Sequence, residues 1–211
     1  MIENAALALA VSYAPKDSRA AIEALFALDG LLAGIVRATT DPLIGQMRLT
    51  WWREALERLD GAPPPAEPVL SAIAEHVLPL GVTGAALAAI TDGWEALLEE
   101  PFGGDAVERH AGRGAALFEA IAVVTGADDR AAVDAGRGWA LADLAAHLRD
   151  PAGGAEAAAR ARPYLRAALA QRWSRAGRTI GALALLARQD LDRTAPVTRL
   201  GQLLWYRFTG R

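Results

Sequence analysis

The chain has 211 residues, of which 53% are hydrophobic, so it is long enough to bury a core. It contains no cysteine, which excludes disulfides, thiolate metal ligands and a cysteine nucleophile. The formal charge of −3, without a clustered basic patch, gives no indication of nucleic-acid binding. No apolar run approaches the roughly 18 residues of a membrane-spanning helix. An acid, Glu3, stands where a signal peptide would be basic, so we expect a cytoplasmic protein.

Helical periodicity dominates the chain and no segment alternates like a strand, so we expect an all-α fold with one domain over residues 1–211. Asp17 is expected to cap a first helix, and Asp41 followed by Pro42 predicts the start of a second helix that reaches Leu59. Further breaks are predicted at 61–68, 79–84, 101–105, 126–129 and 150–154.

The last third of the chain is predicted to hold two helical regions. The first runs from about Ala155 to Ala187, and Pro163 is expected to end or kink a short leading turn within it. The second runs from Pro196 to about Phe208. It combines apolar residues with arginines, namely Val197, Leu200, Leu203, Leu204, Trp205 and Phe208 with Arg199, Arg207 and Arg211. Such a helix suits docking onto the body of the domain or lying in a membrane interface.

The predicted helix after Pro42 carries an apolar stripe at helical spacing, formed by Ile44, Met47, Trp51 and Ala55. Arg48 lies next to Trp51 and Trp52 at the edge of this stripe. A guanidinium beside indole rings is a suitable clamp for a phosphate or another anion. The alternative is an arginine that extends along the stripe to water.

A second candidate site lies on the predicted helix that ends at Arg149. Trp139, Asp143, His147 and Asp150 share one side of this helix by spacing. Asp143 and His147, with Asp150 beyond them, could hold one divalent ion or orient a polar ligand. The alternative is a solvated or internally paired polar face.

His110 and Arg113 lie one turn apart near the start of another predicted helix, which ends at Gly126. We interpret them as a surface pair. The apolar residues that follow, including Leu117 and Phe118, are interpreted as core packing.

The stretch from Arg19 to Glu57, and above all RLTWWREALE after the capped proline, resembles the squalene/phytoene synthase family. The resemblance covers nearly the whole chain and implies the all-α isoprenoid (terpenoid) synthase bundle around a central cavity. In active members the first helix ends in D-D-x-x-D, which binds Mg²⁺ and through it a prenyl diphosphate. Here the matching residues are Ala33, Gly34, Ile35, Val36 and Arg37, and none is a carboxylate.

The second metal motif of the family, close to Q-x-x-N-x-x-R-D-x-x-x-D, is partly kept. Its first and second positions are Asp143 and Ala146, Arg149 and Asp150 match, and the final aspartate is Gly154. The resemblance therefore implies Mg²⁺ only if the protein is active, held by Asp143 and Asp150. The candidate cavity residues are Arg37, Arg48, Trp51, Trp52, Trp139, Asp143, His147, Arg149 and Asp150.

The resemblance and its losses leave three hypotheses. The first is a catalytically degenerate member that binds a prenyl lipid, a quinone-like ligand or a partner protein. The ending resembles bacterial members with decayed motifs, which are similar to a phytoene-synthase-like complex I assembly factor group, and this implies a role in respiratory-complex assembly at the inner membrane. The second is an active Mg²⁺-dependent prenyltransferase that joins two prenyl diphosphates head-to-head in isoprenoid biosynthesis. The third is an interaction module with a packed centre.

Overall fold

The computed structural model describes residues 5–99 and 103–210, and all regular structure in these two segments is helical, which confirms the all-α class. The α-helices are α1 (Ala5–Val11), α2 (Arg19–Ala38), α3 (Pro42–Arg58), α4 (Pro68–His76), α5 (Gly84–Glu95), α6 (Gly104–Thr125), α7 (Ala132–His147), α8 (Pro151–Leu169), α9 (Arg178–Leu191) and α10 (Pro196–Thr209). Short 3₁₀ turns are Lys16–Ser18, Leu78–Leu80 and Ala96–Leu98. The predicted break at 101–105 lies partly outside the described residues. The single domain expected over residues 1–211 stays a prediction.

The start of α3 was predicted correctly, whereas the start of α2 was not. The Asp41 carboxylate accepts a hydrogen bond from the Leu43 N–H at 3.0 Å, as expected for a residue that caps a helix ahead of a proline. Asp17 instead lies within a 3₁₀ turn, and Ser18 is the residue before α2. The 3₁₀ turn leads directly into α2, and the helix begins without a side-chain cap.

The predicted helical region from 155 to 187 is wrong as one unit, because α8 and α9 are separated by residues 170–177. Tertiary contacts hold this break: the Trp173 N–H donates to the Gly210 carbonyl at 3.1 Å, and the Ser174 N–H donates to Asp129 at 3.0 Å. Pro163 does not end a helix but lies inside α8. Its position is exposed, so water can donate a hydrogen bond to the backbone carbonyl that has no N–H partner because of the proline.

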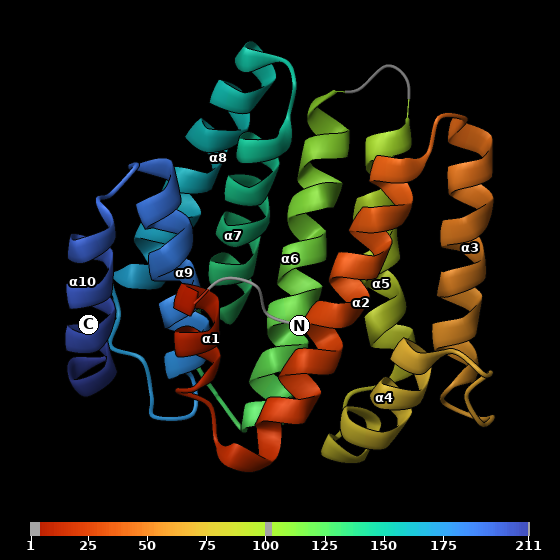
Figure 1. The fold of residues 1–211 in the computed structure, drawn as a ribbon, viewed down its shortest axis with the longest axis horizontal. Helices are drawn as coiled ribbons and strands as arrows, with labels where there is room; N and C mark the ends of the chain where they lie inside the picture. Colours follow the sequence, from red (N-terminus) through yellow and green to blue (C-terminus); the bar gives the residue numbers. More distant parts are fainter. Residues whose placement is uncertain (1–4, 100–102, 211) are drawn as a thin grey trace.

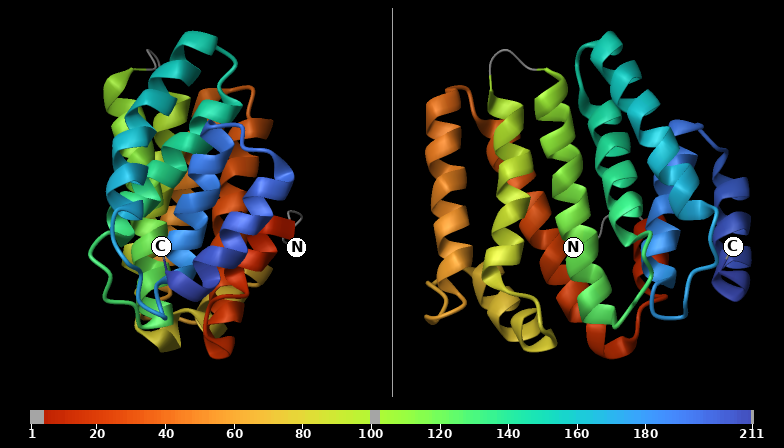
Figure 2. Two further views of the ribbon diagram at one scale, coloured as in Figure 1. Left: turned by 90° about the vertical axis from the view of Figure 1, so that its left-hand side faces the viewer. Right: turned by 180° about the vertical axis from the view of Figure 1, so that it is seen from behind.

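The helices stand roughly side by side and form two layers when seen from the side (Figures 1 and 2). In one layer α3, α5, α6, α7 and α8 follow one another, and each contacts the next. Helix α2 packs across α5 and α6, while α9 packs against α7 and α8. This arrangement leaves α3 and α10 at opposite edges of the molecule (Figure 1).

The apolar stripe predicted on α3 is not the buried side of this helix. Ile44, Met47 and Trp51 are 55%, 66% and 44% exposed, and of the four residues only Ala55 is buried. The buried side of α3 is formed instead by Gly45, Leu49, Trp52, Ala55 and Leu56. The reason is that α3 is apolar on two sides, and as an edge helix it buries only the side toward α5.

Candidate functional site

A buried arginine joins two carboxylates at the centre of the bundle. Arg113 of α6 is fully buried, and its Nη1 atom lies 3.0 and 3.1 Å from the two carboxylate oxygens of Asp29 on α2. Its Nη2 atom lies 3.3 Å from Oδ2 of Asp143 on α7. The Asp29 side chain is 8% exposed and that of Asp143 is 33% exposed. One guanidinium therefore bridges α2 and α7 across α6.

Two tryptophans complete the surroundings of this guanidinium. The Cζ atom of Arg113 lies 4.1 Å from the ring centroid of Trp94 on α5 and 4.9 Å from that of Trp139 on α7. The Trp94 indole N–H also donates to Asp29 at 3.0 Å. Cation–π contacts of this kind strengthen when water is excluded. The aromatic rings thus hold the cation in place where the carboxylates neutralise it.

Glycines allow the helices that carry these groups to approach closely. A Cβ atom built at Gly114 of α6 would lie 2.0 Å from the Gly136 carbonyl oxygen of α7, and one built at Gly136 would lie 2.1 Å from the Gly114 carbonyl oxygen. A Cβ atom at Gly93 of α5 would lie 2.5 Å from Cβ of Arg113. Larger residues at these positions would separate α5, α6 and α7, and with them Trp94, Arg113 and Asp143.

His110 lies one turn before Arg113 and is also fully buried, so the surface pair predicted for these two residues is wrong. Its Nδ1 atom lies 2.9 Å from the Gly93 carbonyl, which makes Nδ1 the donor, and its ring stands edge-on to Trp94. Burial, helped by the positive charge of Arg113, lowers the pKa of His110 to about 3. The imidazole is therefore neutral at physiological pH, which avoids a second positive charge beside Arg113.

Burial also raises the pKa of the Asp29 carboxyl above its usual value, and the charge of Arg113 and the Trp94 N–H oppose that rise. The positive charge of Arg113 thus stabilises the ionised form of Asp29. Removing the guanidinium would leave a buried acid without a counterion.

Of the candidate residues predicted on the helix before Arg149, only Trp139 and Asp143 reach this centre. His147 is mostly exposed, with Nδ1 3.3 Å from a carboxylate oxygen of Asp143. Asp150 lies beyond the end of α7, where its two oxygens accept the N–H groups of Ala152 and Gly153 at 3.2 and 2.9 Å and so cap α8. Arg149 is exposed.

The candidates on α2 and α3 lie away from the centre. Arg37 is exposed near the end of α2, and Arg48 is exposed on α3. Trp51 is 44% exposed and stands edge-on to the buried Trp52, with 5.3 Å between ring centroids. The structure therefore does not bring these four residues together with Asp143, and their role in ligand binding stays a prediction.

The residues at the centre fit Mg²⁺ poorly. Magnesium prefers six oxygen ligands, of which carboxylates usually supply one or two. Within the described segments no group of three histidine, aspartate or glutamate side chains is placed to hold a metal ion. The two carboxylates at the centre, Asp29 and Asp143, already contact Arg113. Binding of a metal ion by Asp143 and Asp150 stays a prediction.

Sequence reasoning missed Asp29 and the true place of Arg113. A signal for Asp29 was present, because it is the only charged residue between Glu23 and Arg37 and lies four residues before Ala33, on the same helix face. Arg113 carried a weaker signal. It is flanked by Gly112 and Gly114, which indicates close packing around it.

Comparisons with known proteins agree with this architecture at the family level. The family model described as squalene/phytoene synthase matches residues 4–165, which includes α1 to α7 and most of α8. Neither the curated proteins nor the solved structures contain a match. Since the family match covers well over half of the 211 residues, the chain belongs to the squalene/phytoene synthase family.

Proposed function

We propose that this family member does not condense prenyl diphosphates and acts instead by binding. The observation that carries the proposal is the Arg113 guanidinium between Asp29 and Asp143. Ionisation of a prenyl diphosphate needs divalent cations that neutralise the departing diphosphate, and the protein must offer free carboxylates to hold them. Here the guanidinium of Arg113 already contacts both central carboxylates and offsets one of their two negative charges.

Arginine stays positively charged at any physiological pH, so deprotonation of the guanidinium cannot break its ion pairs with the two carboxylates. Moving it away would leave Asp29 buried without a counterion, at a cost of about 3–5 kcal/mol. A metal ion would have to displace Arg113 against that cost. This favours a centre that does not bind Mg²⁺ over a centre whose carboxylates are free to bind it.

The ligand that we propose is a prenyl lipid or a quinone-like molecule, which need not carry a diphosphate group. A partner protein is the other proposed ligand. Family membership supports an isoprenoid, and aromatic rings lie beside the ion pair: Phe26 and Phe118 contact Trp139 at 5.9 and 5.5 Å between centroids. The resemblance to the assembly-factor group supports a cytoplasmic role in respiratory-complex assembly at the inner membrane. Deleting the gene in the source organism should then lower the amount of assembled complex I.

The test of catalytic silence is an incubation of the purified chain with farnesyl or geranylgeranyl diphosphate and Mg²⁺, with an active family enzyme as positive control. We expect no squalene or phytoene above background. Binding of geranylgeraniol, measured in parallel, should be independent of Mg²⁺. Product that requires Mg²⁺ would overturn the proposal, and the absence of any lipid binding would favour a partner protein.

The alternative function, an active prenyltransferase, has one observation in its favour. Asp143 is a third exposed and has His147 beside it, so its carboxylate is accessible from solvent. This alternative predicts a Mg²⁺-dependent rise in melting temperature with inorganic diphosphate that is lost in Asp143→Asn. Asp150→Ala is a poorer test, because it removes the cap of α8 as well.

A further inference from the structure

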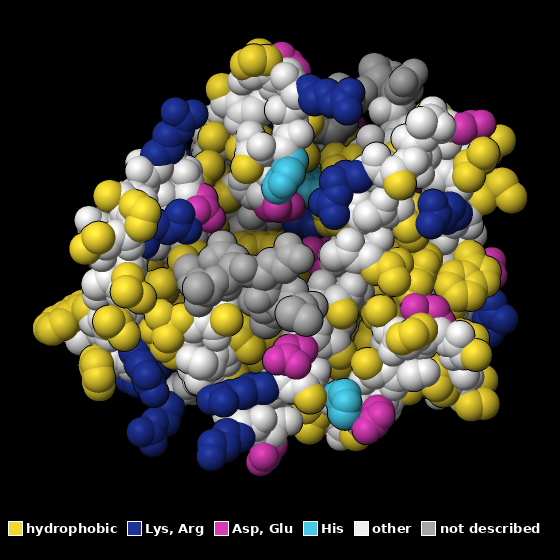
Figure 3. Space-filling model, viewed as in Figure 1, with side chains coloured by type: hydrophobic (Ala, Val, Ile, Leu, Met, Phe, Trp, Pro, Cys, Tyr) yellow, Lys and Arg dark blue, Asp and Glu magenta, His cyan; other side chains and the backbone are white. Residues whose placement is uncertain are grey.

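Helix α10 is attached to the protein by one narrow side and presents an apolar surface on the other. Only Leu203 and Tyr206 of this helix are buried apolar side chains. The opposite side is formed by Val197, Leu200, Leu204, Trp205 and Phe208, which are 86%, 52%, 43%, 68% and 75% exposed. We name these five residues the α10 outer face. Hydrophobic side chains project along this edge of the molecule in Figure 3.

The C-terminal segment that carries the α10 outer face is strongly basic. Residues 171–211 contain eight arginines and two aspartates, a formal charge of +6, whereas residues 1–170 contain 14 basic and 23 acidic residues, a formal charge of −9. Arg172, Arg175, Arg188, Arg193 and Arg207 are exposed. The two aspartates are already paired, Asp190 with Arg199 and Asp192 with Arg162. The excess positive charge near α10 is therefore available to an anionic partner.

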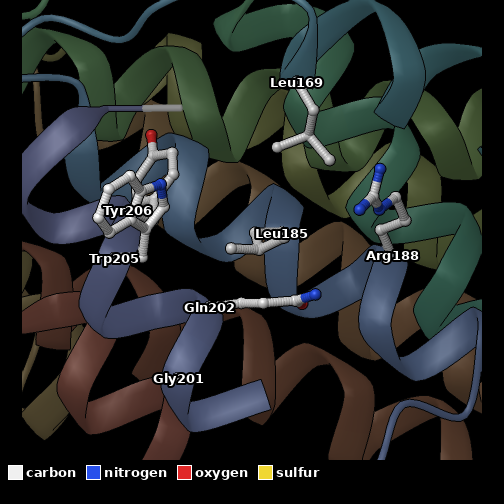
Figure 4. A pocket seen from close by; sticks show the side chains of 7 residues that line it. All are labelled: Leu169, Leu185, Arg188, Gly201, Gln202, Trp205 and Tyr206. Carbon is white, nitrogen blue, oxygen red and sulfur yellow. The ribbon is translucent and has the colours of Figure 1, made fainter. Parts of the chain in front are cut away.

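A pocket of about 340 Å³ adjoins the α10 outer face, between α8, α9 and α10. Figure 4 shows Arg188 at one end, Trp205 and Tyr206 at the other, and Leu169 and Leu185 between them. No acidic side chain pairs with Arg188 in the segments that the structure describes. The pocket thus combines a free cation with an apolar body, and Trp205 belongs both to it and to the outer face.

From these observations we infer that the α10 outer face docks onto an anionic lipid bilayer, with the neighbouring pocket receiving part of one lipid. Tryptophan, phenylalanine and leucine on one side of a helix, with arginines around it, are typical of helices that lie in the membrane interface. Anionic headgroups complement the arginines. A second copy of the chain does not, since it would bring together two C-terminal segments that each carry a formal charge of +6.

None of the described helices is both long and apolar enough to cross a membrane, so the inferred contact is peripheral. Helix α10 also lies outside residues 4–165, which the family model matches. The inference adds a membrane-binding surface to the role at the inner membrane proposed above. It does not depend on the absence of catalysis, because vesicle binding does not require the carboxylates of Asp29 and Asp143 to be either paired or free.

The test is sedimentation of the full chain with vesicles of phosphatidylcholine alone or mixed with phosphatidylglycerol. We expect binding only to the anionic vesicles, weakened by high salt. The variant Val197→Ser, Leu204→Ser, Phe208→Ser should lose about tenfold or more in affinity, because three apolar contacts are removed. Arg188→Gln with Arg193→Gln should weaken binding to anionic vesicles as well.

Helix α3 supplies the matched control, since its Leu43, Ile44 and Met47 are exposed to a similar degree at the opposite edge. The variant Leu43→Ser, Ile44→Ser, Met47→Ser should bind vesicles like the wild type. A lipid with brominated acyl chains should quench tryptophan fluorescence less in Trp205→Phe. No binding to anionic vesicles would overturn the inference, as would equal loss in the α3 variant. A dimer of the wild type that the α10 variant makes monomeric, without vesicle binding, would assign the face to a second copy instead.

Discussion

The centre of the molecule and its two edges use their side chains in opposite ways. At the centre, Arg113 pairs with both Asp29 and Asp143, and Trp94 and Trp139 surround the guanidinium. At the edges, α3 and α10 expose large apolar residues to solvent. In an active enzyme of this family we would expect the reverse, with carboxylates at the centre that are free to bind metal ions and without large exposed apolar residues at the edges. The difference teaches that the charged groups at the centre are already paired, whereas the apolar groups at the two edges are open to solvent.

The largest expected effect comes from breaking the centre. Arg113→Met keeps much of the side-chain volume but leaves Asp29 as a buried carboxyl without a counterion. We expect a loss of about 3–5 kcal/mol in the free energy of unfolding. Urea denaturation followed by circular dichroism measures it.

The control for Arg113→Met is the double variant that also carries Asp29→Asn. It removes the charge of Asp29 while keeping an oxygen that can accept the Trp94 N–H, so the double variant should be more stable than Arg113→Met alone. A double variant that is as unstable as the sum of both single variants would show that the ion pair contributes nothing.

A smaller effect should follow from separating α6 and α7. In Gly114→Ala the new Cβ atom would lie 2.0 Å from the Gly136 carbonyl oxygen, and backbone cannot move as freely as a side chain. We expect destabilisation of about 1–3 kcal/mol, measured by thermal unfolding. Gly112→Ala is the matched control, because outside its chain neighbours and the backbone of its own helix no heavy atom lies within 4 Å of its Cβ position. It should stabilise the helix by about 0.5–1 kcal/mol.

The pH dependence of stability should report the buried imidazole. The folded pKa of His110 is lowered to about 3, so between pH 6.5 and about 3 the unfolded chain takes up a proton that the folded chain refuses. Stability should therefore fall as the pH is lowered through this range, by about 1.4 kcal/mol per pH unit from this residue. His110→Gln should show a shallower dependence in urea titrations at several pH values. Equal slopes in both proteins would contradict a neutral, buried His110.

The smallest effect on stability is expected at the outer edge. Each of Val197→Ser and Phe208→Ser should change the free energy of unfolding by no more than about 0.5 kcal/mol, because these side chains are largely exposed. Leu204→Ser should cost somewhat more, because Leu204 is only 43% exposed. Thermal unfolding of the three single variants checks this. A loss of several kcal/mol would show that the α10 outer face packs on the protein.

The helical class and the family could be predicted from sequence because they rest on periodicity, the cap of Asp41 before Pro42, and a long stretch of similar residues. The orientation of α3 could not, since its apolar residues form two stripes and only the position of α5 decides which is buried. The ion pair of Asp29 with Arg113 joins residues 84 positions apart. Spacing along one helix carries no information about such a partner, so Arg113 was interpreted as a surface residue.

The central claim is that the protein's own arginine, and not a metal ion, engages the carboxylates of Asp29 and Asp143. Calorimetric titration of Mg²⁺ into the purified chain with inorganic diphosphate tests it most directly. We predict no saturable binding beyond that of Mg²⁺ to diphosphate in a titration without protein, because Asp29 and Asp143 are engaged by Arg113. Saturable binding of Mg²⁺ that disappears in Asp143→Asn would contradict the account, since the carboxylate would then be free to hold a metal.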